Sequence, residues 1–365
     1  MGRDATRATE IDPRQVEQYL RRIGHNDARV TSLTPLGQKA QEGLKSYGYG
    51  RPLHVVFESC GTTLDLVIRT MSPDPFGHNR RSARAETLLL GFDTFGDFPR
   101  HIRPLDVGAF TQAGEMLPMG RGEVFLVTEY VEGELYAHDL SILQDRDATS
   151  PTDRARAEAL ARYLVEVHSV PATPSDYGRA VRDLVGSGEG IFGLIDSYPE
   201  DAAAVPVERL RALEAAAIDW RWRIKDRVTR ARRTHGDFHP FNILFKDGID
   251  FSVLDCSRGG AGEPADDVTA LSINYLFFAR TKRPHFDGPL FELWRVFWET
   301  YLNTSGDREI LEVVPPFFAW RALVLASPVW YPNVDTSFRD QLLRFAERLL
   351  GGEPFVPNEV ERLLE

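Results

Sequence analysis

The spacing of hydrophobic positions changes once along this chain of 365 residues. In the first third, apolar residues alternate with polar ones, as in Leu64, Leu66 and Ile68, which is the period of a strand. The strands predicted in this way are residues 29–33, 53–58, 63–70, 101–110 and 123–130. A helical pattern over residues 79–91 interrupts them and ends at Gly91, a typical C-terminal cap. We therefore predict an antiparallel sheet of about five strands with one inserted helix.

Beyond Gly133 the apolar residues recur at helical spacing. Ser150 followed by Pro151 predicts a helix start, because proline is well tolerated at the first helical position. Ser337 with Asp340 resembles a capping box and predicts the start of a later helix. The predicted fold is α+β and bilobal: a small antiparallel-sheet lobe over residues 1–133, including a hinge, and a larger, mainly helical lobe over residues 134–365.

Composition and charge narrow the classes of function. Lysine and arginine number 43 against 54 acidic residues, a formal net charge of −11, so a nucleic-acid partner is not expected. Cys60 and Cys256 are too few for a disulfide framework and are expected to be reduced thiols in the cytosol. No apolar run is long enough to cross a membrane. We expect a cytoplasmic protein that acts on a small molecule.

The segment richest in chemistry runs from His235 to Asp255. Apolar runs at 243–246 and 249–254, separated by a turn, predict a hairpin that places Asn242 and Asp255 on neighbouring strand ends, with Asp237 just before. Phosphoryl transfer needs an acceptor for the attacking hydroxyl's proton and oxygen ligands for Mg²⁺. Asp237 fits the first role, and Asn242 and Asp255 fit the second. The alternative is that His235-Gly236-Asp237 forms only a turn and that Asp237 caps it.

These residues resemble the aminoglycoside phosphotransferase and choline kinase family, small-molecule kinases with a protein-kinase-like fold. The family's catalytic loop, His-Gly-Asp-x-His-x-x-Asn-x-Leu, is matched from His235 to Leu244, and its second metal motif is matched by Asp255 and by residues 262–268. The resemblance implies Asp237 as catalytic base and Asp267 as an aspartate that supports the catalytic loop. It departs at Cys256, where an aromatic residue is usual, and at Glu263, which replaces an aspartate.

The resemblance also implies a nucleotide, ATP or GTP, held with Mg²⁺. Gly37 and Lys39 lie in the loop that would cover the phosphates, although a plain hairpin connection is an equally good interpretation. Arg69 would hold the phosphates with Glu86 behind it, or else be an exposed surface arginine. The Glu129 carbonyl and the Val131 N–H are the candidates for binding the nucleotide base. We expect three histidines, His168, His235 and His239, to be scaffolding, and the alternative for His235 and His239 is direct contact with ligand.

The acceptor side is less well defined by the sequence. Asp266, Tyr275, Trp330 and Tyr331 are candidate wall residues for a cationic, hydroxylated acceptor, and an ordinary acidic surface is the alternative. The basic residues from 221 to 233 are expected to be a solvated helix face, with an anion site as the alternative. The predicted function is phosphoryl transfer to a hydroxyl of a small molecule, such as an aminoglycoside. The alternatives are a metabolic kinase for an amino alcohol, sugar or homoserine-like acceptor, and a nucleotide-binding pseudokinase.

Overall fold

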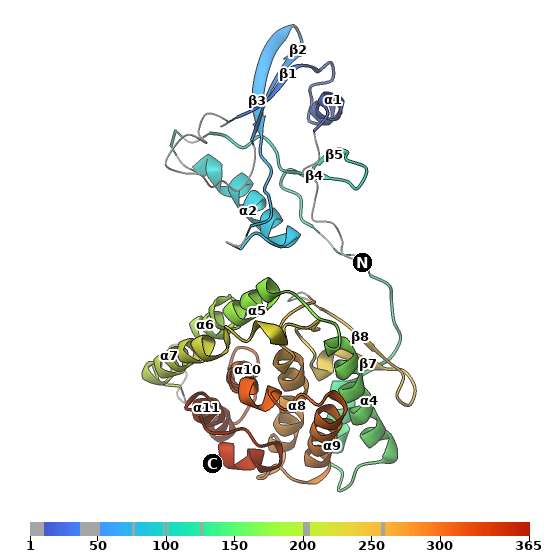
Figure 1. Ribbon diagram of the computed structural model, residues 1–365, viewed down its shortest axis with the longest axis vertical. Coiled ribbons are helices and arrows are strands. Elements are labelled where there is room, and N and C mark those ends of the chain that lie inside the picture. Colours follow the sequence, from blue (N-terminus) through green and yellow to red (C-terminus); the bar gives the residue numbers. More distant parts are fainter. Residues whose placement is uncertain are drawn as a thin grey trace. The chain divides into compact units, whose positions relative to one another are not determined.

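The chain forms two compact units, Met1–Thr128 and Glu129–Glu365. The structure is a computed structural model, drawn in Figure 1, that describes residues 11–36, 52–74, 77–97, 99–100, 102–124, 126, 128–199, 205–256 and 260–365. The first unit carries the sheet and the second carries most of the helices, which is the mixed α+β composition that the sequence predicted. The sequence pattern had suggested a change of character near residue 133.

The first unit contains a three-stranded antiparallel sheet in the order β1-β2-β3. A separate antiparallel hairpin, β4-β5, follows later in the chain. The elements are α1 (Pro13–Arg22), β1 (Arg29–Pro35), β2 (Leu53–Ser59), β3 (Thr62–Ile68), α2 (Arg81–Thr94), η2 (Phe95–Asp97), β4 (Gly108–Phe110) and β5 (Met116–Pro118). Residues Val16 and Leu20 of α1 are completely buried together with Val55 of β2, and this small cluster is the core of the unit.

Three predictions for the first unit were wrong. The described residues of segment 123–130 form no strand, and segment 101–110 is a strand only at Gly108–Phe110. Alternation predicts a strand only where a neighbouring strand can take up the backbone hydrogen bonds, and Pro104 offers no N–H for such a bond. The helix also continues past Gly91 to Thr94, because Gly91 keeps a negative φ and its carbonyl accepts the N–H of Phe95.

The second unit is built from helices around a small antiparallel sheet, β6-β7-β8. Its helices are α3 (Tyr136–Leu143), α4 (Pro151–His168), α5 (Pro174–Gly186), α6 (Ile191–Asp196), α7 (Val207–Ile224), α8 (Ala265–Arg280), α9 (Gly288–Ser305), α10 (Ile310–Ala326) and α11 (Thr336–Leu350). Its strands and short 3₁₀ helices are β6 (Glu134–Leu135), η3 (Val228–Arg230), η4 (Pro240–Asn242), β7 (Ile243–Phe245), β8 (Phe251–Val253) and η5 (Pro357–Leu363).

Two helix starts show what the local sequence could and could not specify. Ser150 caps α4 and forms a reciprocal capping box with Asp153, as its position before Pro151 predicted. The predicted capping box of Ser337 and Asp340 is wrong. The cap of α11 is Asp335, whose carboxylate accepts the Ser337 N–H at 2.8 Å, so the helix begins at Thr336. As the cap residue, Asp335 accepts the N–H of Ser337, which is one of the N–H groups at a helix start that have no partner within the helix.

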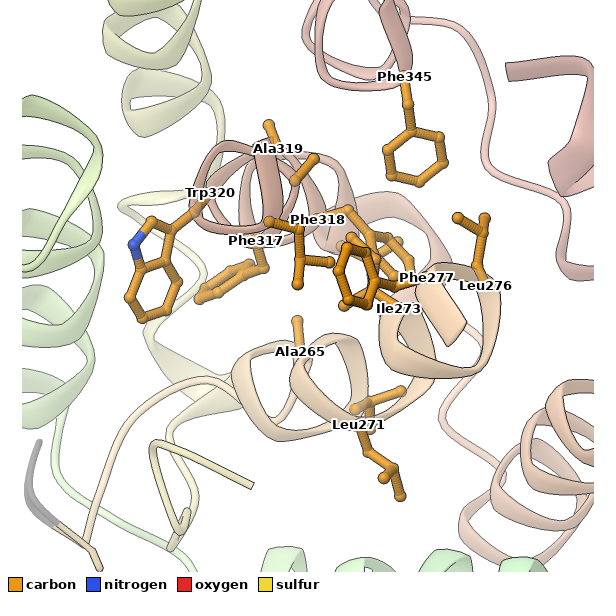
Figure 2. Packing of buried hydrophobic residues seen from close by; sticks show 14 of the residues in the cluster. Ala265, Leu271, Ile273, Leu276, Phe277, Phe317, Phe318, Ala319, Trp320 and Phe345 are labelled. Carbon is orange, nitrogen blue, oxygen red and sulfur yellow. The ribbon is translucent and has the colours of Figure 1, made fainter. Parts of the chain in front are cut away.

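Helices α8 and α10 form the centre of the second unit, with α9 packed against α8 and α11 against α10 (Figure 1). Both central helices are buried over most of their surface. Figure 2 shows Phe317 and Phe318 of α10 and Phe277 of α8 filling the space between them, with Phe345 of α11 on the other side from Trp320. Helices that are buried on most sides belong to a protein core. Helices α8 and α10 therefore form the core of the second unit.

The corner between α5 and α6 depends on a close approach of backbone at Gly193. A Cβ added there would lie 2.0 Å from the Gly188 carbonyl oxygen. We expect Gly193→Ala to lower the free energy of unfolding by about 1–3 kcal/mol, because the corner must open to admit the methyl group. Gly178→Ala, in the middle of α5 with no atom within 4 Å of the new Cβ, should leave stability unchanged or raise it by up to about 1 kcal/mol. Urea denaturation of both variants measures the difference, and equal stabilities would contradict it.

Candidate active site

The loop before the hairpin has the shape that the sequence predicted. Gly236 adopts a φ of 84°, a conformation that glycine takes without strain. The His239 side chain then caps the 3₁₀ helix η4 by accepting the Phe241 N–H at 3.2 Å. β7 and β8 pair antiparallel, with Ile243 opposite Val253. The predicted hairpin is confirmed, with Asp237 before η4 and Asn242 as the last residue of η4.

Asp237, Asn242 and Asp255 come together at one end of the hairpin. The Asn242 side-chain nitrogen donates to the Asp237 main-chain carbonyl at 3.1 Å and lies 3.4 Å from Asp237 Oδ2. The Leu254 N–H donates to the Asn242 carbonyl at 2.8 Å, so Asp255 directly follows the residue that pairs with Asn242. Asp255 is exposed and has a φ of 49°. Aspartate adopts this left-handed conformation more readily than most residues that carry a side chain.

A buried carboxylate supports this loop from below. Asp267, in the first turn of α8, is completely buried and accepts the backbone N–H groups of His235 at 2.8 Å and Gly236 at 2.7 Å. Its Oδ2 also lies 3.0 Å from His168 Nε2, and His168 in turn contacts the Tyr301 hydroxyl at 2.9 Å. Burial alone would raise the pKa of Asp267, but the hydrogen bonds and charge from His168 and the two N–H groups outweigh it and hold the pKa below its usual value.

The two remaining histidines differ in burial. His235 is buried and its Nδ1 accepts the Asp237 N–H at 3.3 Å, which places it inside the loop as scaffolding. His239 is partly exposed, and its Nε2 lies 3.4 Å from Asp237 Oδ2 and 3.3 Å from the Asn242 side-chain nitrogen. His239 is therefore near enough to Asp237 to contact a ligand bound there, and that role stays a prediction.

Sequence reasoning missed the cation that binds Asp237. Arg321, in the middle of α10, places Nη1 2.9 Å from Asp237 Oδ1 and Nη2 2.7 Å from Asp266 Oδ1. Burial alone would lower the pKa of Arg321, but the carboxylates of Asp266 and Asp237 outweigh it and raise the pKa. In the sequence Arg321 interrupts an otherwise apolar run. That lone charge was the available signal, since a buried cation needs partners.

A cavity of about 410 Å³ lies at the turn between α10 and α11. Its lining includes Trp330 and Tyr331, together with Arg280, Asp335 and Phe338. Burial raises the pKa of the Tyr331 hydroxyl; the charge of Arg321 opposes this shift and that of Asp237 adds to it. The role of Trp330 and Tyr331 as walls of an acceptor site stays a prediction.

The other two predicted acceptor residues are placed differently. Asp266 is bound to Arg321 rather than turned to the cavity. Tyr275 is completely buried, and its hydroxyl contacts that of Tyr136 at 3.1 Å, so the expectation that it lines a wall was wrong. Tyr275 lies on the fully buried helix α8, where sequence alone does not distinguish an aromatic core residue from a pocket residue.

The residues predicted for nucleotide binding lie on separate segments of the chain. Gly37 and Lys39 lie outside the described residues. Arg69 follows β3 and Glu86 lies on α2, both exposed, and no ion pair joins them in the part of the chain that the structure describes. Glu129 and Val131 lie in an irregular segment before β6. The nucleotide-binding roles of these residues stay predictions.

The basic segment 221–233 is mixed rather than a uniform solvated face. Arg230 is buried and binds both Glu263, at 2.7 Å, and Asp307, at 2.8 Å. Glu263 is completely buried, so the residue that departs from the family motif serves as the partner of Arg230. Trp222 is exposed on the same segment, whereas Trp220 is buried. Arg230 is therefore structural and is excluded as part of an anion site.

Among the described residues, no group of three or more histidine, cysteine, aspartate or glutamate side chains is arranged to hold a metal ion. None of the described helices has the length and hydrophobicity that a membrane span requires.

The sequence matches the phosphotransferase enzyme family over residues 81–303, more than half of the chain. The chain therefore belongs to the phosphotransferase enzyme family, and its enzyme class is the one that the catalytic-loop motif predicted. No curated protein matches the sequence.

Among solved structures, three similar chains are a glucosamine kinase, an aminoglycoside phosphotransferase and a choline kinase. The glucosamine kinase, in complex with glucosamine, ADP and inorganic phosphate, is 18% identical with a TM-score of 0.37; the match covers 61% of this chain and 57% of the kinase. The gentamicin complex of APH(2")-IIa is 13% identical, with coverages of 94% and 97% and a TM-score of 0.34. The choline kinase LicA from Streptococcus pneumoniae is 11% identical, with coverages of 93% and 99% and a TM-score of 0.35.

Proposed function

We propose that this phosphotransferase transfers the terminal phosphoryl group of ATP or GTP to a hydroxyl group of a small molecule. The observation that carries the proposal is the contact of Asp237 with Asn242, beside Asp255, at one end of a hairpin. A carboxylate that accepts a proton, flanked by two oxygen-bearing side chains, is the set of groups that phosphoryl transfer requires. The pseudokinase alternative lacks such support, because all three side chains are present.

Asp237 is the proposed base. As the acceptor oxygen attacks the terminal phosphorus, the acceptor O–H bond breaks and its proton passes to the Asp237 carboxylate. The bond from that phosphorus to the bridging oxygen breaks at the same time, and the nucleoside diphosphate leaves. Arg321 and the Asn242 amide hold the carboxylate in place for this step.

Asn242 and Asp255 fit a Mg²⁺ ion that also binds phosphate. The Asn242 nitrogen is turned toward Asp237, which leaves its amide oxygen for another partner. The exposed Asp255 carboxylate adds a charged oxygen. One or two protein oxygens, completed by phosphate and water, are typical of Mg²⁺ in such enzymes. When bound, the ion would neutralise charge on the transferred phosphoryl group.

The cavity at Trp330 and Tyr331 is the proposed acceptor site. Its volume of about 410 Å³ is that of a site for a small organic ligand. The aromatic walls and the carboxylate of Asp335 favour a hydroxylated acceptor that is neutral or cationic. This chemistry fits an aminoglycoside, and it equally fits an amino sugar or an amino alcohol, so the acceptor must be found by experiment.

The test measures ADP or GDP release by the full chain with Mg²⁺ and one acceptor at a time. Glucosamine, choline, gentamicin and spectinomycin sample the chemistry proposed for the cavity. We expect one acceptor class to give a turnover of about 1–100 s⁻¹, a phosphorylated product by mass spectrometry, and loss of activity when EDTA removes the metal. Nucleotide binding without phosphoryl transfer to any acceptor or to water would support the pseudokinase alternative instead.

A further inference from the structure

Arg321 is a charged residue in a helix that is otherwise apolar. It lies in the middle of α10, where its neighbours Ala319, Ala322 and Leu323 are completely buried, and its own exposed fraction is 7%. Its guanidinium also packs 4.0 Å from the centre of the Trp320 ring. A cation in such surroundings is unfavourable unless good partners surround it, and replacement by an apolar residue of similar volume would pack equally well. The core therefore does not by itself require an arginine here.

The partners of Arg321 connect two functional segments. Nη1 binds Asp237 Oδ1 in the catalytic loop, and Nη2 binds Asp266 Oδ1 at the start of α8. Nη2 also lies 3.4 Å from the Gly236 carbonyl oxygen. Asp266 precedes Asp267, whose carboxylate holds the other side of the same loop through the N–H groups of His235 and Gly236. Asp267 therefore binds the N–H groups of the loop. Arg321, which is bound to Asp266, contacts the Gly236 carbonyl and the Asp237 carboxylate of the same loop.

The two oxygens of Asp237 have different partners. Oδ1 is bound by Arg321 at 2.9 Å, whereas Oδ2 has the Asn242 amide nitrogen and His239 Nε2 at 3.4 Å each. A charged hydrogen bond at this distance restrains Oδ1 strongly. The arginine fork is divided between two carboxylates, with Nη1 on Asp237 and Nη2 on Asp266, so it holds the two side chains in register.

We propose that Arg321 is a positioning residue for phosphoryl transfer: it fixes Asp237 by Oδ1, with Asp266 as its anchor, so that the carboxylate is held in place to accept the proton of the acceptor hydroxyl. This inference rests on the proposed function, because it assigns a role to Arg321 only through Asp237. The Asp237 carboxylate receives the acceptor proton as the new O–P bond forms, and the nucleoside diphosphate leaves with the electrons of the broken O–P bond. Arg321 keeps its own protons throughout the step.

The test compares Arg321→Met, Arg321→Lys, Asp266→Asn and the double variant Arg321→Met/Asp266→Asn in the full chain. ADP release is measured with whichever of glucosamine, choline, gentamicin and spectinomycin is turned over fastest, or with water if none exceeds it. Arg321→Met should lower kcat about 100-fold and change KM for ATP by less than about threefold, since displacement of the base affects the chemical step alone. Arg321→Lys should recover part of kcat, because an ammonium cannot reach both carboxylates at once.

Asp266→Asn should lower kcat about tenfold by loosening the arginine. The double variant should be no slower than Arg321→Met, because the proposed effect of Asp266 on Asp237 passes through Arg321. The control is Arg209→Met, which removes an arginine that likewise binds two carboxylates, Glu347 and Asp340, where α7 meets α11. It should leave kcat within about threefold of the natural chain's value once the folded fraction is counted from thermal denaturation and ADP titration.

The outcomes separate this inference from the proposed function. If the natural chain releases no ADP above the level of Asp237→Asn, the proposed function fails and the inference fails with it. If the natural chain is active but folded Arg321→Met keeps more than a third of its kcat, only the inference is overturned. Should Arg321→Met not fold, an unchanged kcat in folded Asp266→Asn and Arg321→Lys overturns it in the same way.

Discussion

Asp237→Asn should lower kcat about 10³-fold, within the range of roughly 10²–10⁴ expected when a general base is removed. Asparagine has nearly the same shape, so it can keep a contact with the Asn242 amide nitrogen, which lies 3.4 Å from Asp237 Oδ2. It cannot take up a proton at neutral pH, so the acceptor hydroxyl loses its base. Nucleotide affinity should change by less than about threefold, because the altered group acts on the acceptor.

The measurement for this variant is ADP release under saturating nucleotide and acceptor, with nucleotide affinity from calorimetry. The matched control is Asp226→Asn, since the Asp226 carboxylate is 86% exposed and lies outside the catalytic loop. That control should retain full activity and stability. Turnover of folded, nucleotide-binding Asp237→Asn within tenfold of the natural chain would remove Asp237 from the proposed role.

Asp267→Ala should lower the free energy of unfolding by about 3–5 kcal/mol and abolish turnover. The substitution leaves the N–H groups of His235 and Gly236 and the His168 ring without their shared acceptor in a completely buried place. Each buried donor that is left without an acceptor costs about 1–3 kcal/mol of desolvation. The catalytic loop should then lose its shape, so kcat falls together with stability.

The pH dependence of stability provides a separate check on Asp267. Its pKa in the folded chain is lower than its ordinary value, so its contribution is complete above a pH of about 4 and is lost as the pH falls through the folded value. The difference in unfolding free energy between the natural chain and Asp267→Asn should therefore be constant from pH 7 to about pH 5 and shrink below about pH 4. Urea denaturation across this range measures it. A difference that grows on acidification would show that the carboxylate is not the stabilising form.

Local patterns were sufficient wherever a short stretch of chain satisfies its own hydrogen bonds. The start of α4 at Ser150 and the β7-β8 hairpin before Asp255 were both predictable for this reason. Strand predictions in the first unit failed where the sequence did not show which second strand would pair with the segment. Segment 123–130 alternates in sequence, yet its described residues pair with no neighbouring strand. Alternation describes a possible strand face and cannot supply the second strand.

In the candidate site too, residues close together in the sequence were predictable, whereas a residue on a core helix was not. Asp237, Asn242 and Asp255 lie within 19 positions of one another in the sequence, and their spacing around a hairpin was enough to predict the contact of Asp237 with Asn242 and the place of Asp255 after the paired strand. Tyr275 was misassigned because helix α8 is buried on all sides, so an aromatic residue there has no solvent-facing side to be distinguished by sequence. On a core helix, only the packing of the neighbouring elements decides which residues line a pocket and which are enclosed in the core.

The amino-acid sequence by itself determined the class of the protein, the order of a strand-rich and a helix-rich part, and the β7-β8 hairpin that follows Asn242, because each is encoded over short distances along the chain. Only the tertiary structure decided that Arg321, 84 positions after Asp237, binds that carboxylate and Asp266. Which buried charge meets which partner depends on how α8 and α10 pack, and packing is a property of the whole core rather than of any local segment.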